Sequence, residues 1–238
     1  MNCYSIEISK LCKLYRNKVV LRDLDLKIKS NLVYGLVGNN GVGKSTLLKC
    51  ISGVENISYG HILINGKDIE EYDRELYNVI GMQFQELYYQ EKIKVKEYCK
   101  IFSSIYDTHD FAEELLDLFE LGALKNTLVK DLSGGQKQIL GLITALLGRP
   151  KILLLDETTS GMDTRNTEKC LNGILDYKQK NGCTIIFVTH DYRNILDLAD
   201  RIIWMKENYE IKEFELENMD NDKKSDVVKE IWMKESAY

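Results

Sequence analysis

The segment from Gly38 to Thr46 constrains this chain more than any other part of it. It reads Gly-Asn-Asn-Gly-Val-Gly-Lys-Ser-Thr, which fits the pattern Gly-x4-Gly-Lys-Ser/Thr of a phosphate-binding loop. Glycines let backbone N–H groups turn toward a polyphosphate, and the start of the following helix adds a partial positive charge. We expect Lys44 to reach the β- and γ-phosphates and Ser45 to ligate Mg²⁺. The spacing does not fit Gly-x-Gly-x-x-Gly, so a dinucleotide-binding fold is excluded.

Predicted strands and helices alternate along the chain. We expect β structure over 4–37, with strands at 24–29 and 32–37, and further strands at 61–64, 152–155 and 184–188. Helices are expected at 45–52, within 90–147 and at 164–179. The strands at 152–155 and 184–188 are apolar on both faces, which is typical of buried parallel strands. The pattern predicts an α/β protein with a mainly parallel sheet.

Two carboxylates follow the apolar strand that starts after Lys151. They are Asp156 and Glu157, and they fall at the carboxyl end of a strand, where ligands gather in open α/β sheets. Asp156 is expected to hold Mg²⁺, directly or through water, and Glu157 to orient and deprotonate an attacking water. An acidic turn after a strand is common, so this interpretation depends on the phosphate loop being present in the same chain.

Composition narrows the class of protein. The chain has 238 residues, 44% of them hydrophobic, and a single proline, which favours one domain without a flexible linker. The net charge of −5 argues against a dedicated nucleic-acid surface. No apolar run approaches the roughly 18 residues of a membrane span, the N-terminus lacks a secretory signal, and the six cysteines form no Cys-x-x-Cys pair. We therefore expect a cytoplasmic protein.

The motif Leu132-Ser-Gly-Gly-Gln136 points to one family. With it, the chain resembles the ATP-binding cassette (ABC) family, the nucleotide-binding domains of ABC transporters, over almost its whole length. The resemblance implies a P-loop NTPase fold with a mainly parallel core sheet, an N-terminal antiparallel β subdomain and an inserted α-helical subdomain. It predicts a single domain over 1–238, with the catalytic core at about 1–85 and 148–206, the helical subdomain at about 86–147 and a tail at 207–238.

The resemblance also implies roles for individual residues. Tyr15 matches the aromatic residue that stacks on adenine, Gln85 the Q-loop glutamine, Asp163 the D-loop aspartate and His190 the switch histidine. The catalytic residues expected are Lys44, Gln85, Glu157 and His190, and those expected to ligate Mg²⁺ are Ser45, Gln85 and Asp156. The residues expected to bind ATP are Tyr15, Gly38, Asn39, Asn40, Gly41, Val42, Gly43, Lys44, Ser45, Thr46, Ser133, Gly134, Gly135, Gln136 and Asp163.

The implied mechanism uses two cassettes. Ser133 is a good N-cap residue, so the Ser-Gly-Gly segment is expected to begin a helix and expose N–H groups as a second anion-binding surface. In the family two domains pack head to tail, and each ATP lies between the Lys44 loop of one and the Ser133 helix of the other. The chain would then be the ATP-hydrolysing subunit of a homo- or heterodimer, on the inner face of the membrane through a separate permease.

Several questions stay open at this stage. Residues 94–106 and 111–121 look most like exporter-type subunits for drugs, peptides or lipids. The alternatives are a soluble ABC ATPase acting on ribosomes or DNA, and a nucleotide sensor that closes on ATP but hardly turns over.

The chain departs from the family at Thr158, where a proline is usual, and at Ile139, where an arginine is usual. It also lacks the usual prolines after Gln85.

The tail carries a short amphipathic pattern. Val227, Val228, Ile231 and Trp232 form one apolar face, which predicts a C-terminal helix that docks on its own domain. A helix that binds a partner is the alternative.

Overall fold

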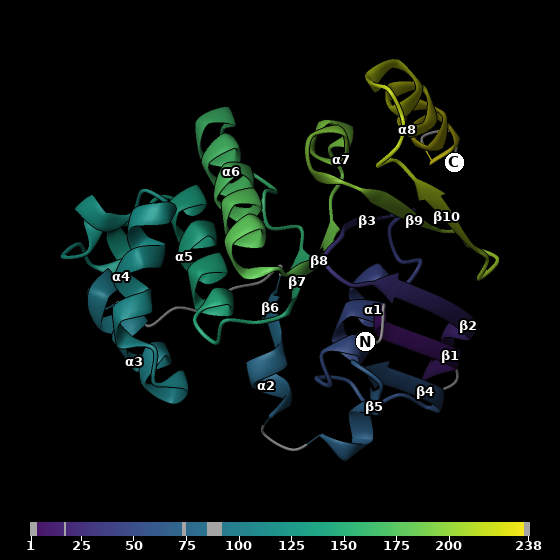
Figure 1. Cartoon of the computed structure of the whole chain (residues 1–238), viewed down its shortest axis with the longest axis horizontal. Coiled ribbons are helices and arrows are strands. Elements are labelled where there is room, and N and C mark those ends of the chain that lie inside the picture. Colours follow the sequence, from purple (N-terminus) through teal and green to yellow (C-terminus); the bar gives the residue numbers. More distant parts are fainter. Residues whose placement is uncertain (1–3, 17, 73–74, 85–91, 236–238) are drawn as a thin grey trace. The chain divides into compact units, whose positions relative to one another are not determined.

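Long alternating segments near the N-terminus form an antiparallel sheet. In the computed structural model, which describes residues 4–16, 18–72, 75–84 and 92–235, strands β1 (Tyr4–Tyr15) and β2 (Lys18–Lys29) pair along their length. β4 (Tyr59–Ile64) joins the other edge of β1, and β5 (Lys67–Asp68) pairs with β4. Figure 1 shows this sheet beside helix α1 (Lys44–Ile51).

The chain divides into two compact units. The first comprises Met1–Leu76 and Thr184–Tyr238, and the second comprises Tyr77–Cys183. Helix α2 (Leu76–Val79) lies where the chain passes from one to the other. These units are groups of mutual contacts, and the boundaries predicted for the core and the helical subdomain remain predictions.

The first unit also contains the buried strand that precedes the phosphate loop and the two strands that pair with it in parallel. β3 (Val33–Val37) pairs in parallel with both β8 (Thr184–Val188) and β9 (Arg201–Met205), and β10 (Ile211–Glu215) pairs antiparallel with β9. Every residue of β3, β8 and β9 is buried. The remaining elements of this unit are the 3₁₀ turn η1 (Ile69–Glu71) and helices α7 (Tyr192–Leu198) and α8 (Asn221–Glu235).

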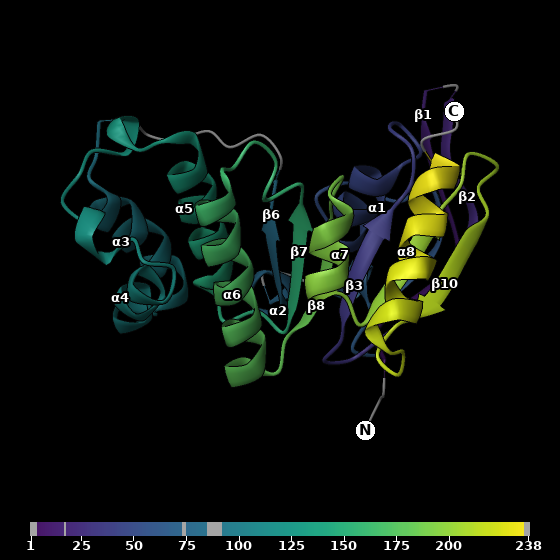
Figure 2. The ribbon, with the colours of Figure 1, turned by 90° about the horizontal axis from the view of Figure 1, so that it is seen from above.

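The second unit combines a parallel strand pair with a group of helices. β6 (Ile80–Gln83) pairs with β7 (Ile152–Asp156). The helices are α3 (Val95–Tyr106), α4 (His109–Leu118), α5 (Gly134–Leu146) and α6 (Thr164–Asn181), with 3₁₀ turns η2 (Gly122–Leu124) and η3 (Val129–Asp131). Figure 2 shows α5 and α6 side by side, in agreement with their contacts.

This architecture confirms the predicted α/β fold with mostly parallel buried strands and an antiparallel β subdomain. The C-terminal amphipathic segment forms α8, whose Val228 and Ile231 are buried. The prediction that this helix docks on its own domain is therefore confirmed. None of the helices in the described part of the chain combines the length and hydrophobicity that a membrane crossing needs.

Candidate nucleotide-binding site

The predicted phosphate loop joins a buried strand to a helix, as expected. It starts where β3 ends at Val37 and finishes where α1 begins at Lys44. Gly38 has a φ of 148°, and a Cβ added there would lie 2.4 Å from the carbonyl oxygen of Met205. Gly43, the N-cap of α1, has a φ of 111°. Both positions therefore require glycine, because a side chain would meet backbone strain and, at Gly38, a rigid carbonyl.

The side chain of Lys44 lies against its own loop. Its Nζ donates hydrogen bonds to the carbonyl oxygens of Gly38 at 2.6 Å and Asn39 at 3.0 Å. The residue is only 6% exposed. This geometry concentrates a positive charge at the loop whose N–H groups are expected to bind phosphate. Ser45 and Thr46 follow in the first turn of α1 and are half-buried.

Tyr15 stands at the end of β1 with 38% of its surface exposed. The Nζ of Lys13 lies 4.6 Å from the centroid of its ring. Lys13 itself is buried, and its Nζ donates to Glu55 Oε2 at 3.1 Å and to the carbonyl oxygen of Asn56 at 2.6 Å. Partial burial, followed by the nearby charge of Glu55, raises the pKa of Tyr15.

Lys13 and Glu55 are supports that the sequence reasoning missed. The two residues are 42 positions apart, so no local pattern joins them. One feature of the sequence could have indicated this pair: Lys13 lies within the predicted β region. A lysine there is expected to be solvent-exposed, and a buried one requires an acidic partner.

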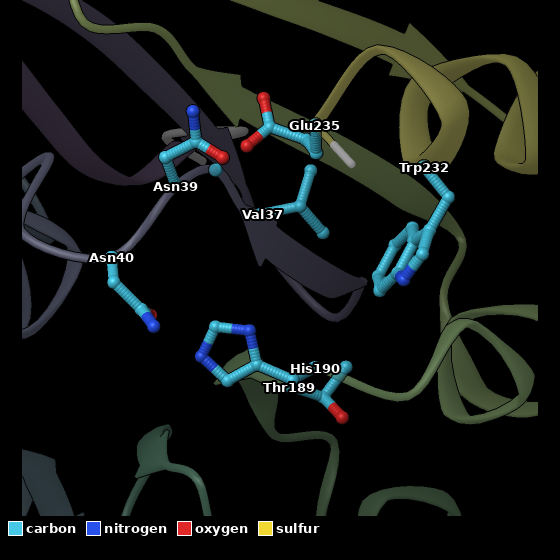
Figure 3. Close-up of a pocket in the computed structure, with 8 residues that line it drawn as sticks. Val37, Asn39, Asn40, Thr189, His190, Trp232 and Glu235 are labelled. Carbon is cyan, nitrogen blue, oxygen red and sulfur yellow. The ribbon is translucent and has the colours of Figure 1, made fainter. Parts of the chain in front are cut away.

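His190 follows β8 and is exposed, next to the beginning of the phosphate loop. It lines a pocket of about 180 Å³ in the first unit (Figure 3), together with Val37, Gly38, Asn39, Asn40, Thr189, Trp232 and Glu235. Figure 3 shows Asn40 and His190 facing each other, with Asn39 near Glu235 at the other end and Trp232 to one side. The structure therefore brings His190 together with the phosphate loop.

Hydrogen bonds fix the backbone around His190. Thr189 Oγ1 accepts from the N–H of Asp191 and from Nδ2 of Asn194, each at 3.1 Å. Asp191 is the N-cap of α7 and accepts from the N–H of Arg193 at 2.9 Å. Hydrogen bonds from Arg193 lower the pKa of Asp191, so the cap remains charged at neutral pH. The histidine thus stands at a well-defined strand-to-helix junction.

In the second unit, Ser133 caps helix α5 as predicted. Its Oγ accepts from the N–H of Gln136 at 3.3 Å, and Gln136 Oε1 accepts from the N–H of Ser133 at 2.9 Å. Such a capping box fixes the start of a helix. Ser133 and Gly134 are exposed, and a Cβ added at Gly134 would meet nothing within 4 Å. The start of α5 at Ser133 and Gly134 is therefore open to a ligand from outside.

Asp163 and Gly135 share a neighbour, Asn166. Asp163 is the N-cap of α6, and its Oδ1 accepts from the N–H of Asn166 at 2.8 Å. Its Oδ2 accepts from Asn166 Nδ2, also at 2.8 Å. A Cβ added at Gly135 would lie 3.1 Å from that same Nδ2. The structure therefore joins the predicted signature and D-loop segments through Asn166, a residue that the motifs did not single out.

Asp156 is the last residue of strand β7 in the second unit, and Glu157 follows it. Asp156 is 3% exposed and Glu157 is half-buried. Glu157 has a φ of 55° and its carbonyl oxygen accepts from the N–H of Ser160 at 3.0 Å. A left-handed conformation in a residue other than glycine is uncommon and is often associated with functional sites. The carboxylate is thus held at a tight turn.

The two departures from the family pattern lie in buried positions. Thr158 is buried, and its Oγ1 has no hydrogen-bond partner among the described residues. Ile139 is buried in α5. An apolar core residue thus stands where the family usually has a charged arginine. Gln83, near the end of β6, donates from Nε2 to the carbonyl oxygen and to Oε1 of Gln138, both at 3.0 Å. Gln85 lies outside the described residues.

The predicted site residues therefore divide between the two units. The first contains Tyr15, the loop 38–46 and His190, and the second contains the segment 133–136, Asp156, Glu157 and Asp163. Within each unit, the structure brings together residues that are distant in sequence: His190 with Asn40, and Gly135 with Asp163 through Asn166.

Comparisons with known proteins show the family to which this chain belongs. The profile of the family described as "ABC transporter" matches residues 21–160. A similar relative is the "Methionine import ATP-binding protein MetN" of Clostridium acetobutylicum, which is 35% identical over 206 residues. That match covers 83% of this chain and 64% of the relative, so the chain spans just under two thirds of the relative's length.

Solved structures resemble the fold closely. A nucleotide-free ATP-binding cassette from an ABC transporter superposes with a TM-score of 0.83 at 22% identity, with 95% of each chain covered. The dimeric post-hydrolysis state of the cassette MJ0796, bound to ADP and Pi, gives a TM-score of 0.80 at 25% identity. It covers 90% of this chain and 100% of MJ0796. The chain belongs to the ABC transporter family and contains its ATP-binding domain, an ATPase domain.

Proposed function

We propose that this chain hydrolyses ATP to drive solute uptake through a separate membrane permease. One observation carries the proposal: the chain pairs a phosphate loop, with Lys44 held against it, with a second helix start, capped by Ser133 and open to solvent. Helix N-termini bind anions. An ATP held between two chains needs the phosphate loop of one chain and such a helix start from the other. This supports a composite site in which the Ser133 segment of a second chain completes the ATP site of the first.

The nucleotide is held by the first unit in this proposal. Lys44 exchanges its two carbonyl partners for the β- and γ-phosphates, and the N–H groups of the loop 38–46 surround them. Tyr15 stacks on adenine with one face of its ring, while the Lys13 ammonium supports the other face. The cation lies 4.6 Å from the ring centroid, within the range of a cation–π interaction.

Hydrolysis uses the residues to which the resemblance to the family assigns a role. Glu157 takes a proton from the attacking water, and His190 holds the γ-phosphate end of the nucleotide. The Ser45 hydroxyl and the Asp156 carboxylate are hard oxygen donors of the kind that Mg²⁺ prefers, so they fit that ion, and Gln85 is a third candidate ligand. When bound, Mg²⁺ would neutralise developing charge on the phosphates.

The direction of transport is where the proposal departs from the expectation of export. The relative in Clostridium acetobutylicum is named a methionine import protein, which differs from the exporter interpretation of residues 94–121. We therefore propose import, with methionine as the first solute to test. Membrane association through the permease, and a homo- or heterodimer of cassettes, belong to the same proposal.

Reconstituted vesicles test the direction. The chain is purified with its co-purifying membrane protein and placed in vesicles that hold labelled methionine inside, and ATP is added outside, where only outward-facing cassettes can use it. An importer in that orientation carries the label out of the lumen, and Lys44→Ala should abolish the efflux. ATP-dependent accumulation of solute inside the vesicle would contradict import and restore the exporter interpretation.

A further inference from the structure

Helix α8 contacts α7 near both ends of α7. Near the C-terminal end, Lys224 Nζ donates to the carbonyl oxygen of Leu196 at 2.7 Å. Near the N-terminal end, the rings of Trp232 and Tyr192 meet edge to face, with centroids 6.4 Å apart. Val228 and Ile231 are buried between these two contacts along α8. A seven-residue helix is thus held at two points by a longer one.

Trp232 contacts the N-terminal end of α7, which is the end next to His190. α7 begins at Tyr192, two residues after the histidine, and Trp232 and His190 line the same pocket (Figure 3). The backbone that joins His190 to Tyr192 is short, and Thr189 Oγ1 accepts hydrogen bonds from Asp191 and Asn194 beside it. A displacement of the N-terminal end of α7 would therefore move His190 relative to Asn40.

The far end of α8 is itself anchored. Trp204 Nε1, in β9, donates to Glu235 Oε1, and the Lys234 ammonium lies 6.0 Å from the centroid of the Trp204 ring. Trp204 is buried, so these contacts fix the C-terminal turn of α8 to a strand that pairs with β3. The strand that leads into the phosphate loop and the helix that contacts α7 are thereby tied together.

We propose that Trp232 and Lys224 are positioning residues for His190, which they hold beside the phosphate loop by fixing α7 at its two ends. The inference rests on the proposed role of His190 at the γ-phosphate. Neither side chain touches the nucleotide in this account. Their loss should therefore slow turnover without weakening ATP binding, because misplacing a catalytic group by about 1 Å can slow a reaction about 100-fold.

Steady-state phosphate release by the full chain separates this inference from a merely structural role. Trp232→Ala should lower kcat about 10- to 100-fold and leave KM for ATP nearly unchanged. Trp232→Phe keeps an aromatic ring against Tyr192 and should restore most of kcat. Met233→Ala is the matched control, because this neighbour on α8 is 71% exposed and should leave both constants unchanged. Lys224→Met tests the other end of α7 if Trp232→Ala does not fold.

A double-mutant cycle with His190→Ala completes the test. If Trp232 acts through His190, adding Trp232→Ala to His190→Ala should lower kcat no further. An equal loss in both backgrounds, or a rise in KM at constant kcat, would overturn the positioning role while leaving the proposed function intact. If His190→Ala itself left turnover unchanged, the proposed role of the histidine and this inference would both be wrong.

Discussion

Lys13→Met removes the support behind the proposed adenine platform. Methionine fills a similar volume but carries no charge, so the exchange deletes the ammonium that lies 4.6 Å from the Tyr15 ring centroid. It also removes the two hydrogen bonds to Glu55 and Asn56. The phosphate loop is untouched by this change. We therefore expect the variant to lose affinity for the base of ATP and to keep its affinity for the polyphosphate.

The size of the loss in ATP affinity depends on how buried the contact between Lys13 and Tyr15 is. A cation–π interaction contributes about 0.5–1 kcal/mol when exposed and about 2 kcal/mol when desolvated. The Lys13 side chain is 9% exposed, so the upper end of that range applies. Because this contact is already present without ATP, its loss weakens binding by freeing the Tyr15 ring from the orientation that stacks on adenine, so Kd for ATP should rise by at most about 30-fold. The variant should also unfold about 1–3 kcal/mol more easily, because Glu55 loses a charged hydrogen-bond partner.

Isothermal titration with two ligands tests the reasoning. ATP should bind more weakly to Lys13→Met, and inorganic tripolyphosphate, which has no base, should bind as it does to the unchanged chain. Lys27→Met is the matched control, since Lys27 contacts Glu7 at 3.3 Å and lies 5.3 Å from the Tyr4 ring centroid on the same sheet. Equal weakening of both ligands, or tighter binding of ATP, would refute a supporting role for Lys13.

Three further changes test the proposed nucleotide site. Lys44→Ala should abolish tight ATP binding, measured by titration, because it removes the mobile cation that the phosphate loop holds. Ser133→Arg should leave ATP binding by the monomer nearly intact but prevent ATP-driven dimerisation in light scattering, because the new side chain collides with a γ-phosphate held by the partner. Gly38→Ala should lower thermal stability, by about 1–3 kcal/mol, and weaken ATP binding, because its Cβ would lie 2.4 Å from the Met205 carbonyl oxygen.

Local chemistry made part of this structure predictable. Ser133 with Gln136 three residues later is a capping-box pattern, and the structure contains that box. The uninterrupted apolar run before Asp156 predicts a buried strand, and every residue of β7 is buried. The glycine spacing of the phosphate loop likewise predicts the strand–loop–helix junction that starts at Gly38.

Contacts between distant parts of the chain were not predictable in the same way. The hydrogen bond of Lys13 with Glu55 and the ring contact of Trp232 with Tyr192 depend on which elements the fold places together, and no motif records that placement. The left-handed backbone of Glu157 was not predictable either, because a positive φ is usually signalled by a glycine and this position holds a glutamate. Residues 94–121 predicted export, whereas a similar relative is named a methionine import protein, so the direction of transport stays a proposal.

Glu157→Gln tests the central claim, that ATP closes two of these chains and hydrolysis separates them. The exchange keeps the shape of the side chain but removes its ability to accept a proton from water, so phosphate release should fall about 10²- to 10⁴-fold. ATP binding should persist, and the variant should accumulate in Mg-ATP as a dimer, seen by light scattering. Glu168→Gln, on an exposed position of α6, should behave like the unchanged chain. Hydrolysis at the unchanged rate, or lost hydrolysis without a trapped dimer, would contradict the claim.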